Sequence, residues 1–203
     1  YQRRVRGQKL MSKRSICKIL FVGDTGVGKT SLIKRIVYDK FENNMLPTMG
    51  VGHSIKSVCC KNQFIQLQFW DTPGQEKFRA INSLYYSEVD YFIAVYDVCS
   101  HESFQNLEFW LNQIRSENPS ACILIVANKV DMKLRRIVER EQAMNFCRRS
   151  QITHWELSAL TGAGTADFLE MLVRQIQKDE IEVTQHLIQK EIGIKKDKKD
   201  RCC

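Results

Sequence analysis

Short apolar runs alternate along this chain with longer segments in which apolar residues recur every three or four positions. The short runs predict strands, because a few apolar residues between polar turns suit a buried strand. Strands are expected at 16–22, 91–96, 122–127 and 154–157. The longer segments predict amphipathic helices, whose apolar stripe faces a core. Helices are expected at 29–38, from about 80 to 86, and at 101–116, 139–149 and 165–177.

Two further strands, at 55–60 and 64–70, are separated only by a short turn at Lys61 and Asn62. Both alternate apolar and polar residues, so they predict a hairpin that adds an antiparallel edge to the sheet. Strands that alternate with helices are typical of an α/β fold. The sequence therefore predicts a six-stranded, mostly parallel sheet with one antiparallel edge strand and five helices.

The net charge of +8 is concentrated at the two ends of the chain. Residues 1–14 hold six basic side chains and no acid, and residues 190–203 hold six basic and three acidic ones. The nearly neutral remainder argues against nucleic acid as a partner, while the ends favour an anionic membrane surface. We expect a disordered basic extension at 1–14, one folded domain at 15–178, and a flexible basic tail at 179–203.

The cysteines and the apolar runs indicate the compartment. The eight cysteines form no C-x-x-C pair and no regular spacing, so a reducing, cytosolic setting is the simpler interpretation. No apolar run approaches the roughly 20 residues that a membrane-spanning helix needs.

The segment 23–30, GDTGVGKT, fits the phosphate-loop pattern of Gly, four residues and then Gly-Lys-Thr. It lies between a predicted strand and a predicted helix, where its glycines can turn backbone N–H groups towards a polyphosphate. Lys29 would reach the terminal phosphates and the Thr30 hydroxyl would ligate Mg²⁺. A glycine turn without this function would need neither side chain. The predicted phosphate contacts are Thr25, Gly26, Val27, Gly28, Lys29, Thr30 and Ser31.

The segment 70–76, WDTPGQE, follows a predicted strand. Ligands of open α/β sheets lie at the carboxyl ends of strands, so Asp71 falls on the Mg²⁺ side. Gly74 can bring its N–H to a γ-phosphate, and Gln75 can position an attacking water. The alternative is an ordinary turn with an N-capping Asp71. Lys29 and Gln75 are the predicted catalytic residues, and we find no arginine finger in the chain itself.

The segment 128–131, NKVD, directly follows another predicted strand. The carboxylate of Asp131 can accept two parallel N–H bonds from guanine, a donor pair that adenine lacks. An ordinary loop at a strand end is the alternative. After the strand that ends at Leu157, Ser158, Ala159 and Leu160 follow, and the Ala159 N–H could reach guanine O6. The predicted base contacts are Asn128, Lys129, Asp131, Ser158, Ala159 and Leu160.

With these segments in this order, the chain resembles the small GTPases of the Ras superfamily, and among them the Rab proteins. The similarity covers about 15–177 and the last two residues, and includes Trp110 and the segments 75–79, 96–98 and 102–107. It implies a P-loop small G domain that binds GTP or GDP with Mg²⁺. It also implies that Thr48 ligates Mg²⁺ in the GTP state and that Phe41 packs against guanine. The implied metal ligands are Thr30, Thr48 and Asp71.

Several positions depart from the Rab pattern. Pro73 stands where Rab proteins usually have Ala, and it holds Thr72 extended, which affects turnover more than binding. His53 replaces the usual Phe, and it joins Trp70 and Tyr85 in what resembles the aromatic patch that effectors read. Leu160 replaces the usual Lys. These departures bear on which effectors bind.

The chain ends in Cys202 and Cys203 after a basic run. In Rab-like proteins such a pair accepts two geranylgeranyl groups, and two lipid chains are what stable anchoring requires. The five basic side chains within 195–201 would add attraction to anionic lipid. The expected location is the cytosol and the cytoplasmic face of an intracellular membrane.

The function that this resemblance implies is a monomeric, Rab-like GTP-binding switch that hydrolyses GTP slowly and controls vesicle trafficking. Its implied partners are a guanine nucleotide exchange factor, a GTPase-activating protein, effectors, a GDP-dissociation inhibitor and a prenylation escort. One alternative is a GTP-binding membrane scaffold with little or no hydrolysis. Another is a phosphate-loop kinase or ATPase, against which the segment 128–131 argues.

Overall fold

A computed structural model of the chain describes residues 15–43, 46–60, 63–73 and 86–179. The chain divides into two compact units, Tyr1–Thr165 and Ala166–Cys203. The first unit contains a six-stranded sheet in the order β2-β3-β1-β4-β5-β6. Its strands are β1 (Ser15–Val22), β2 (Gly52–Cys60), β3 (Gln63–Asp71), β4 (Tyr91–Asp97), β5 (Cys122–Asn128) and β6 (Thr153–Glu156).

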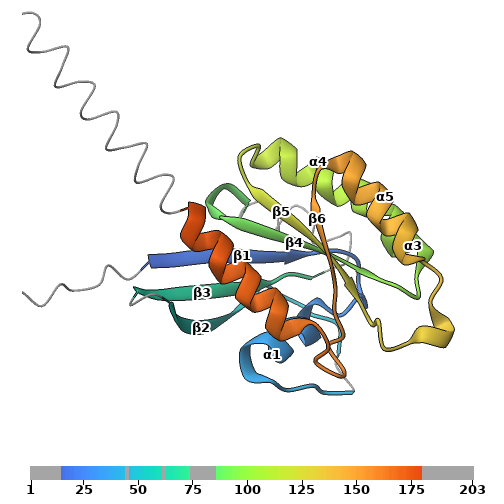
Figure 1. The fold of residues 1–203 in the computed structure, drawn as a ribbon, viewed down its shortest axis with the longest axis horizontal. Coiled ribbons are helices and arrows are strands. Elements are labelled where there is room, and N and C mark those ends of the chain that lie inside the picture. Colours follow the sequence, from blue (N-terminus) through green and yellow to red (C-terminus); the bar gives the residue numbers. More distant parts are fainter. Residues whose placement is uncertain (1–14, 44–45, 61–62, 74–85, 180–203) are drawn as a thin grey trace, which may run out of the picture. The chain divides into compact units, whose positions relative to one another are not determined.

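All neighbouring strands are parallel except β2 and β3, which pair antiparallel. The predicted α/β class, the strand number and the antiparallel edge are therefore confirmed. The central strand β1 pairs with β3 on one side and with β4 on the other (Figure 1). From β1 the chain crosses to the edge strand β2, returns through β3, and then continues outward on the other side through β4, β5 and β6. The chain therefore changes sides of the sheet next to β1, and such a switch point is where open α/β sheets bind ligands.

Helices of the first unit cover both faces of the sheet (Figure 1). They are α1 (Lys29–Tyr38), α3 (His101–Gln105), α4 (Leu107–Glu117) and α5 (Arg140–Ser150). Successive side chains of β1 point to opposite faces of the sheet. Leu20 and Val22 belong to the hydrophobic cluster that includes Trp110 and Ile114 of α4. Ile19 and Phe21 point to the other face. These four side chains are fully buried, so the end of β1 that leads into the phosphate loop is packed on both faces.

One predicted helix, at 101–116, is two helices in the structure. The break falls at Asn106, whose ψ of −9° opens the backbone between α3 and α4. The Asn106 side chain donates to Asp24 Oδ2 at 2.7 Å, a partner 82 residues earlier in the chain. An Asn side chain can form hydrogen bonds that compete with the backbone hydrogen bonds of a helix. Here the bond from Asn106 to the distant Asp24 favours the break between the two helices.

Of the two other predicted helices, the one at about 80–86 is described only at its end, and the one at 165–177 is confirmed. The segment 80–85 lies outside the described residues, and Tyr86–Glu88 forms a 3₁₀ turn. A helix runs through 165–179, most of it in the second unit, and Phe168, Leu172 and Ile176 along it are buried. Within the described residues, no helix has the length and apolar character to cross a membrane.

Candidate functional site

A cavity of about 330 Å³ opens where the phosphate loop, the segment after α1 and the loops after β5 and β6 meet. Its volume is at the lower end of the range for small-molecule sites. Most of the predicted contact residues line it. These are Thr25, Gly26, Gly28, Lys29, Thr30, Ser31, Phe41, Thr48, Asn128, Lys129, Asp131, Ala159 and Leu160.

Other predicted residues lie behind the cavity or outside the described part of the chain. Val27, Asp71 and Ser158 do not line the wall, but each contacts a residue that does, as the hydrogen bonds below show. Of the residues predicted for nucleotide binding, catalysis and lipidation, four fall outside the described residues: Gly74, Gln75, Cys202 and Cys203. Their roles stay predictions.

Two glycines of the phosphate loop are required by the packing around them. Gly23 has φ +135°, and a Cβ there would lie 2.2 Å from the carbonyl oxygen of Val95 on β4. Gly28 has φ +93°, and a Cβ there would lie 2.4 Å from Asn128 Nδ2. Both conformations also disfavour any residue with a side chain. The loop can therefore approach β4 and Asn128 only because these positions are Gly.

The first turn of α1 is open towards the cavity. Its N-cap, Gly28, offers no side-chain cap, and the first turn contains no acidic residue. The first N–H groups of a helix have no partner within the helix, and the dipole adds positive potential at the same end. This end of α1 can therefore bind an anion such as a phosphate.

Lys29 is buried at the start of α1. Its Nζ donates to the carbonyl oxygens of Gly23 and Asp24, at 2.8 and 2.9 Å. Burial lowers the pKa of Lys29 to about 8, and the charges of Asp71 and Asp24 offset only part of this effect. A phosphate oxygen would be a stronger acceptor for the ammonium than a neutral carbonyl, so binding an anion should raise this pKa.

If bound nucleotide raises the pKa of Lys29 above its value in the empty protein, nucleotide affinity should depend on pH. The empty protein loses the Lys29 proton near pH 8, whereas the nucleotide-bound protein keeps it, so binding takes up a proton above pH 8. The contribution of Lys29 to affinity should be constant below pH 7 and fall by up to about tenfold per pH unit above 8. Titration calorimetry of GDP in buffers of different ionisation enthalpy measures this uptake. The variant Lys29→Gln should show none, and equal uptake in both proteins would contradict the role of Lys29.

Two hydroxyls and one carboxylate converge beside the phosphate loop. Thr30 Oγ1 donates to Asp71 Oδ2 at 2.6 Å and lies 2.9 Å from Thr48 Oγ1. The other carboxylate oxygen, Asp71 Oδ1, is buried and has no hydrogen-bond partner among the residues that the structure describes. Burial raises the pKa of Asp71, and the hydrogen bond from Thr30 opposes this rise.

These oxygens fit a small divalent cation. Mg²⁺ prefers oxygen ligands and uses one or two carboxylates together with substrate phosphates. An unsatisfied carboxylate oxygen is costly when buried, and a cation would remove that cost. Among the described residues no group of three or more His, Cys, Asp or Glu could hold a metal, so a protein-only cage is not found there. The residues that would hold Mg²⁺ are Thr30, Thr48 and Asp71.

We expect Asp71→Asn to weaken the dependence of nucleotide binding on Mg²⁺. An amide keeps the hydrogen bond from Thr30 but removes the negative charge that attracts the cation. In wild-type protein, chelating Mg²⁺ should speed GDP release by at least about tenfold, and in the variant this ratio should shrink towards one. Release rates of a fluorescent GDP with and without EDTA measure it. An unchanged ratio would remove Asp71 from the cation site.

The far end of the cavity is built from the loops after β5 and β6. Asn128 Nδ2 donates to the carbonyl oxygen of Val27 at 2.8 Å, and its Oδ1 accepts from the Ala159 N–H at 3.2 Å. Asp131 Oδ1 accepts from Ser158 Oγ at 2.5 Å. Asn128 thus connects both loops to the phosphate loop, and Ser158 orients the carboxylate of Asp131.

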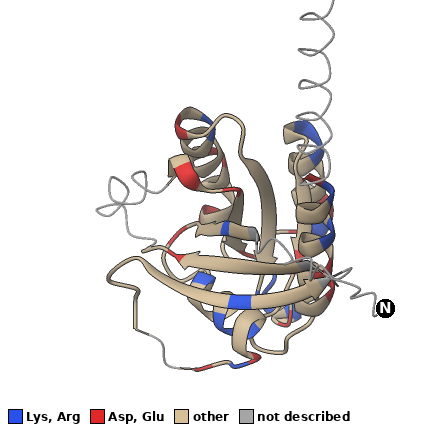
Figure 2. Cartoon of the chain, turned by 90° about the vertical axis from the view of Figure 1, so that its left-hand side faces the viewer, with Lys and Arg blue, Asp and Glu red and all other residues tan. Residues whose placement is uncertain are grey.

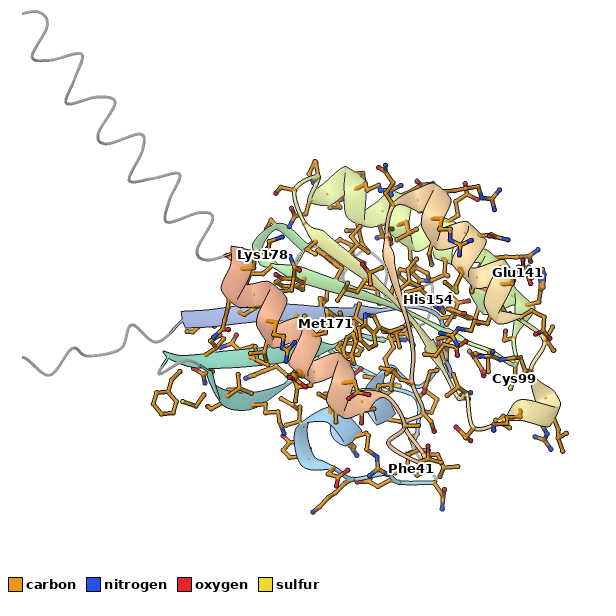
Figure 3. All side chains as sticks on the ribbon, in the orientation of Figure 1. Phe41, Cys99, Glu141, His154, Met171 and Lys178 are labelled. Atoms are coloured by element: carbon orange, nitrogen blue, oxygen red, sulfur yellow. The ribbon has the colours of Figure 1, made fainter. Side chains whose placement is uncertain are left out.

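Lys129 crosses the top of the phosphate loop. Its Nζ donates to the carbonyl oxygen of Gly26 at 2.8 Å and pairs with Asp97 Oδ2 at 2.5 Å. Phe41 lies on the segment after α1 (Figure 3). It lines the same cavity as Lys129. Both side chains can therefore contact one bound base.

Three residues that position this site were not assigned a role from the sequence. Asp97 ends β4 and orients Lys129. Asp24 of the phosphate loop accepts from Asn106 Nδ2 and, at 2.9 Å, from Trp110 Nε1. Arg35 on α1 donates to the loop after β6. The signal for Asp97 was its place at the carboxyl end of a parallel strand, whereas the other two depend on contacts between distant parts of the chain.

Two residues of the implied effector patch lie on the antiparallel pair β2 and β3. His53 of β2 is exposed and stacks on Trp70 of β3, with ring centroids 5.3 Å apart. The third residue, Tyr85, lies outside the described residues. Behind this edge, Thr72 is buried and its Oγ1 donates to the carbonyl oxygen of Phe21 at 2.7 Å, which fixes the backbone before Pro73.

Comparison with known proteins gives a consistent picture. The model of the Ras family matches residues 18–178. Ras-related protein Rab-13 of Canis lupus familiaris is 39% identical over 161 residues, which cover 78% of this chain and 79% of that protein. GTP-binding protein YPT1 of Saccharomyces cerevisiae is 38% identical over 162 residues, 79% of each chain. Ras-related protein SEC4 of Candida albicans is 36% identical over 168 residues, 82% of this chain and 80% of its own.

Proposed function

The chain belongs to the Ras family and is a small GTPase of the Rab type, and we propose that the cavity described above is where it binds GTP and hydrolyses it to GDP. One observation carries this proposal. The phosphate loop, the Thr30–Asp71 pair and the loops that hold Asp131 and Ala159 all meet at one cavity. A triphosphate, a divalent cation and a guanine base each have matching groups there.

Different residues of the cavity contact different parts of the nucleotide. The open N-terminus of α1 and Lys29 bind the phosphates. Asp131 accepts the N–H groups of guanine, and the Ala159 N–H donates to its O6. That N–H now bonds Asn128 Oδ1 at 3.2 Å, so it already points at an acceptor on the cavity side of the loop.

Hydrolysis requires groups that act on the γ-phosphate and the attacking water. Lys29 stabilises the charge that develops on the transferred group. Mg²⁺, when held by Thr30, Thr48 and Asp71, supplies further positive charge beside the phosphates. Gln75 positions the water by accepting a hydrogen bond from it with its amide oxygen, and its amide N–H donates to the transition state. Without an arginine from a partner the reaction is slow, which suits a switch.

The loss of the γ-phosphate is read out by the segments around Thr48 and Gly74. In the GTP state both are held by contacts to the γ-phosphate and Mg²⁺, and hydrolysis releases them. Thr48 already lies within hydrogen-bond distance of Thr30. Effectors would read the GTP state on the adjoining edge, where His53 and Trp70 stack. An exchange factor, an activating protein and a GDP-dissociation inhibitor are the other proposed partners.

The protein acts in vesicle trafficking, and we propose that prenyl groups on Cys202 and Cys203 hold it on the cytoplasmic face of a membrane. The basic residues within 195–201 support this proposal through attraction to anionic lipid. Lys and Arg of the described residues are interspersed with Asp and Glu in the view of Figure 2. Imaging wild-type protein beside a variant that lacks both cysteines tests the anchor, because only the wild type should reach a membrane.

The proposed reaction is tested by loading the protein with GTP and following a single turnover. We expect slow conversion to GDP, strongly accelerated by an activating protein. Stable GTP after many hours, with GTP binding intact and no response to any activating protein, would instead favour a binding scaffold without hydrolysis.

A further inference from the structure

We propose that Arg35 is a positioning residue for guanine recognition, although it does not line the cavity. It lies on α1, one helical turn and a half after the phosphate loop, and its side chain is only 15% exposed. This inference rests on the proposed function, because it assigns Arg35 to the base end of the same site.

The guanidinium of Arg35 is bonded to the loop after β6. Arg35 Nε donates to the carbonyl oxygen of Ala159 at 2.9 Å, and Nη2 donates to that of Leu160 at 2.8 Å. These partners are 124 and 125 residues away in the chain. A planar guanidinium presents its donors in a fixed arrangement, so two parallel bonds determine both the position and the direction of the backbone.

The same guanidinium also holds the end of α1. Its Nη1 donates to the backbone oxygen of Asp39 at 3.1 Å and to Asp39 Oδ1 at 2.8 Å. Asp39 ends the helix with φ +53°, and Phe41 follows two residues later. One side chain therefore links the helix of the phosphate loop, the loop that contacts guanine O6, and the segment that carries Phe41.

The loop that Arg35 holds is tightly folded. Ser158 accepts from the N–H groups of Thr161 and Gly162, and its hydroxyl donates to Asp131. Beneath the loop, a Cβ on Gly162 would lie 3.6 Å from Arg35 Cδ, so the aliphatic part of Arg35 packs closely there. Without Arg35, the carbonyl of buried Ala159 would lose its donor, and the loop would shift to satisfy it.

The consequence concerns the peptide N–H of Ala159. This N–H and the carbonyl that Arg35 binds lie in adjacent peptide planes that share the Cα atom of Ala159, so a shift of the loop that moves the carbonyl also displaces the N–H. A loop that moves to hydrate the Ala159 carbonyl misaligns the N–H that donates to guanine O6. Arg35 should therefore affect how the protein distinguishes the atom at position 6 of the base, as well as how long the nucleotide stays bound.

The test compares release of GDP and of 6-thio-GDP, whose sulfur is a poorer acceptor, from the Mg²⁺-loaded protein at pH 7. Wild-type protein should release 6-thio-GDP faster than GDP. Arg35→Gln should release GDP about tenfold faster and bring the two rates close together. Arg35→Lys keeps the positive charge but not the planar pair of donors, so its GDP release rate should lie between those of wild type and Arg35→Gln. If Arg35→Gln fails to fold, Arg35→Lys is used for the comparison instead. Arg115→Gln is the matched control, because Arg115 donates to the carbonyl oxygen of Ser150 instead.

Two results would overturn the inference. One is an unchanged GDP release rate in Arg35→Gln, and the other is equal acceleration of both nucleotides with their ratio preserved, as a general loosening of the fold would give. A wild-type protein that does not prefer GDP to ADP would overturn the proposed function instead, so the two failures are distinguishable.

Discussion

Replacing Asp131 by Asn should reduce the affinity for GTP by roughly 100- to 1,000-fold. The carboxylate can accept both N–H groups on the guanine edge, whereas an amide accepts one and turns its own N–H₂ group against the other. A buried donor left without an acceptor accounts for most of the loss. The fold should survive, because an amide oxygen can still accept the hydrogen bond from Ser158 Oγ. Equilibrium binding of a fluorescent GTP analogue measures the change.

The same variant should gain affinity for xanthosine triphosphate. Xanthine carries a carbonyl where guanine carries its exocyclic amine, and the amide of Asn can donate to that carbonyl. Asp167→Asn makes the same chemical change at an exposed helical position and should alter neither affinity. If Asp131→Asn binds GTP as tightly as wild type, Asp131 does not read the base.

Replacing Gln75 by Leu should slow GTP hydrolysis on the order of 10- to 100-fold while leaving GTP affinity close to that of wild type. Leu has a similar volume but can neither accept a hydrogen bond from water nor donate one to the transition state. The loss should therefore appear in the single-turnover rate and not in the dissociation constant. Hydrolysis of radiolabelled GTP by the preloaded protein separates the two quantities.

The matched control for this substitution is Gln142→Leu on α5, an exposed position outside the cavity. It should hydrolyse GTP at the wild-type rate. An unchanged rate in Gln75→Leu would remove Gln75 from the mechanism, and it would direct attention to other groups near the γ-phosphate, beginning with Lys29.

Local patterns were sufficient to predict the strands and the segments that form the cavity. Short apolar runs located four strands, and alternation of apolar and polar residues located the two strands of the hairpin. The helix α1 was predicted with the bounds that the structure has, Lys29–Tyr38. The contacts proposed for Lys29 and Asp131 followed from their residue types and from their places after strands. Both residues indeed line one cavity although they are separated by about 100 positions. This succeeds because the carboxyl ends of parallel strands meet at one edge of the sheet.

Contacts between distant segments could not be predicted in this way. Phe41 and Thr48 came only from the family resemblance, since nothing in their spacing indicates a base or a cation. The break at Asn106 depends on a carboxylate 82 residues away, and a helical pattern carries no information about it. Arg35 resembles any basic residue on a polar helix face until the fold brings Ala159 and Leu160 beside it.

The selectivity of the cavity for guanine is tested most directly by competition between nucleotides in the presence of Mg²⁺. Protein loaded with fluorescent GDP is mixed with increasing GDP or ADP, and the displaced fluorophore is measured at equilibrium. The account predicts that GDP displaces the probe at equimolar concentration and that ADP fails to do so even at about 1,000-fold excess. Displacement by ADP and GDP at similar concentrations would contradict it.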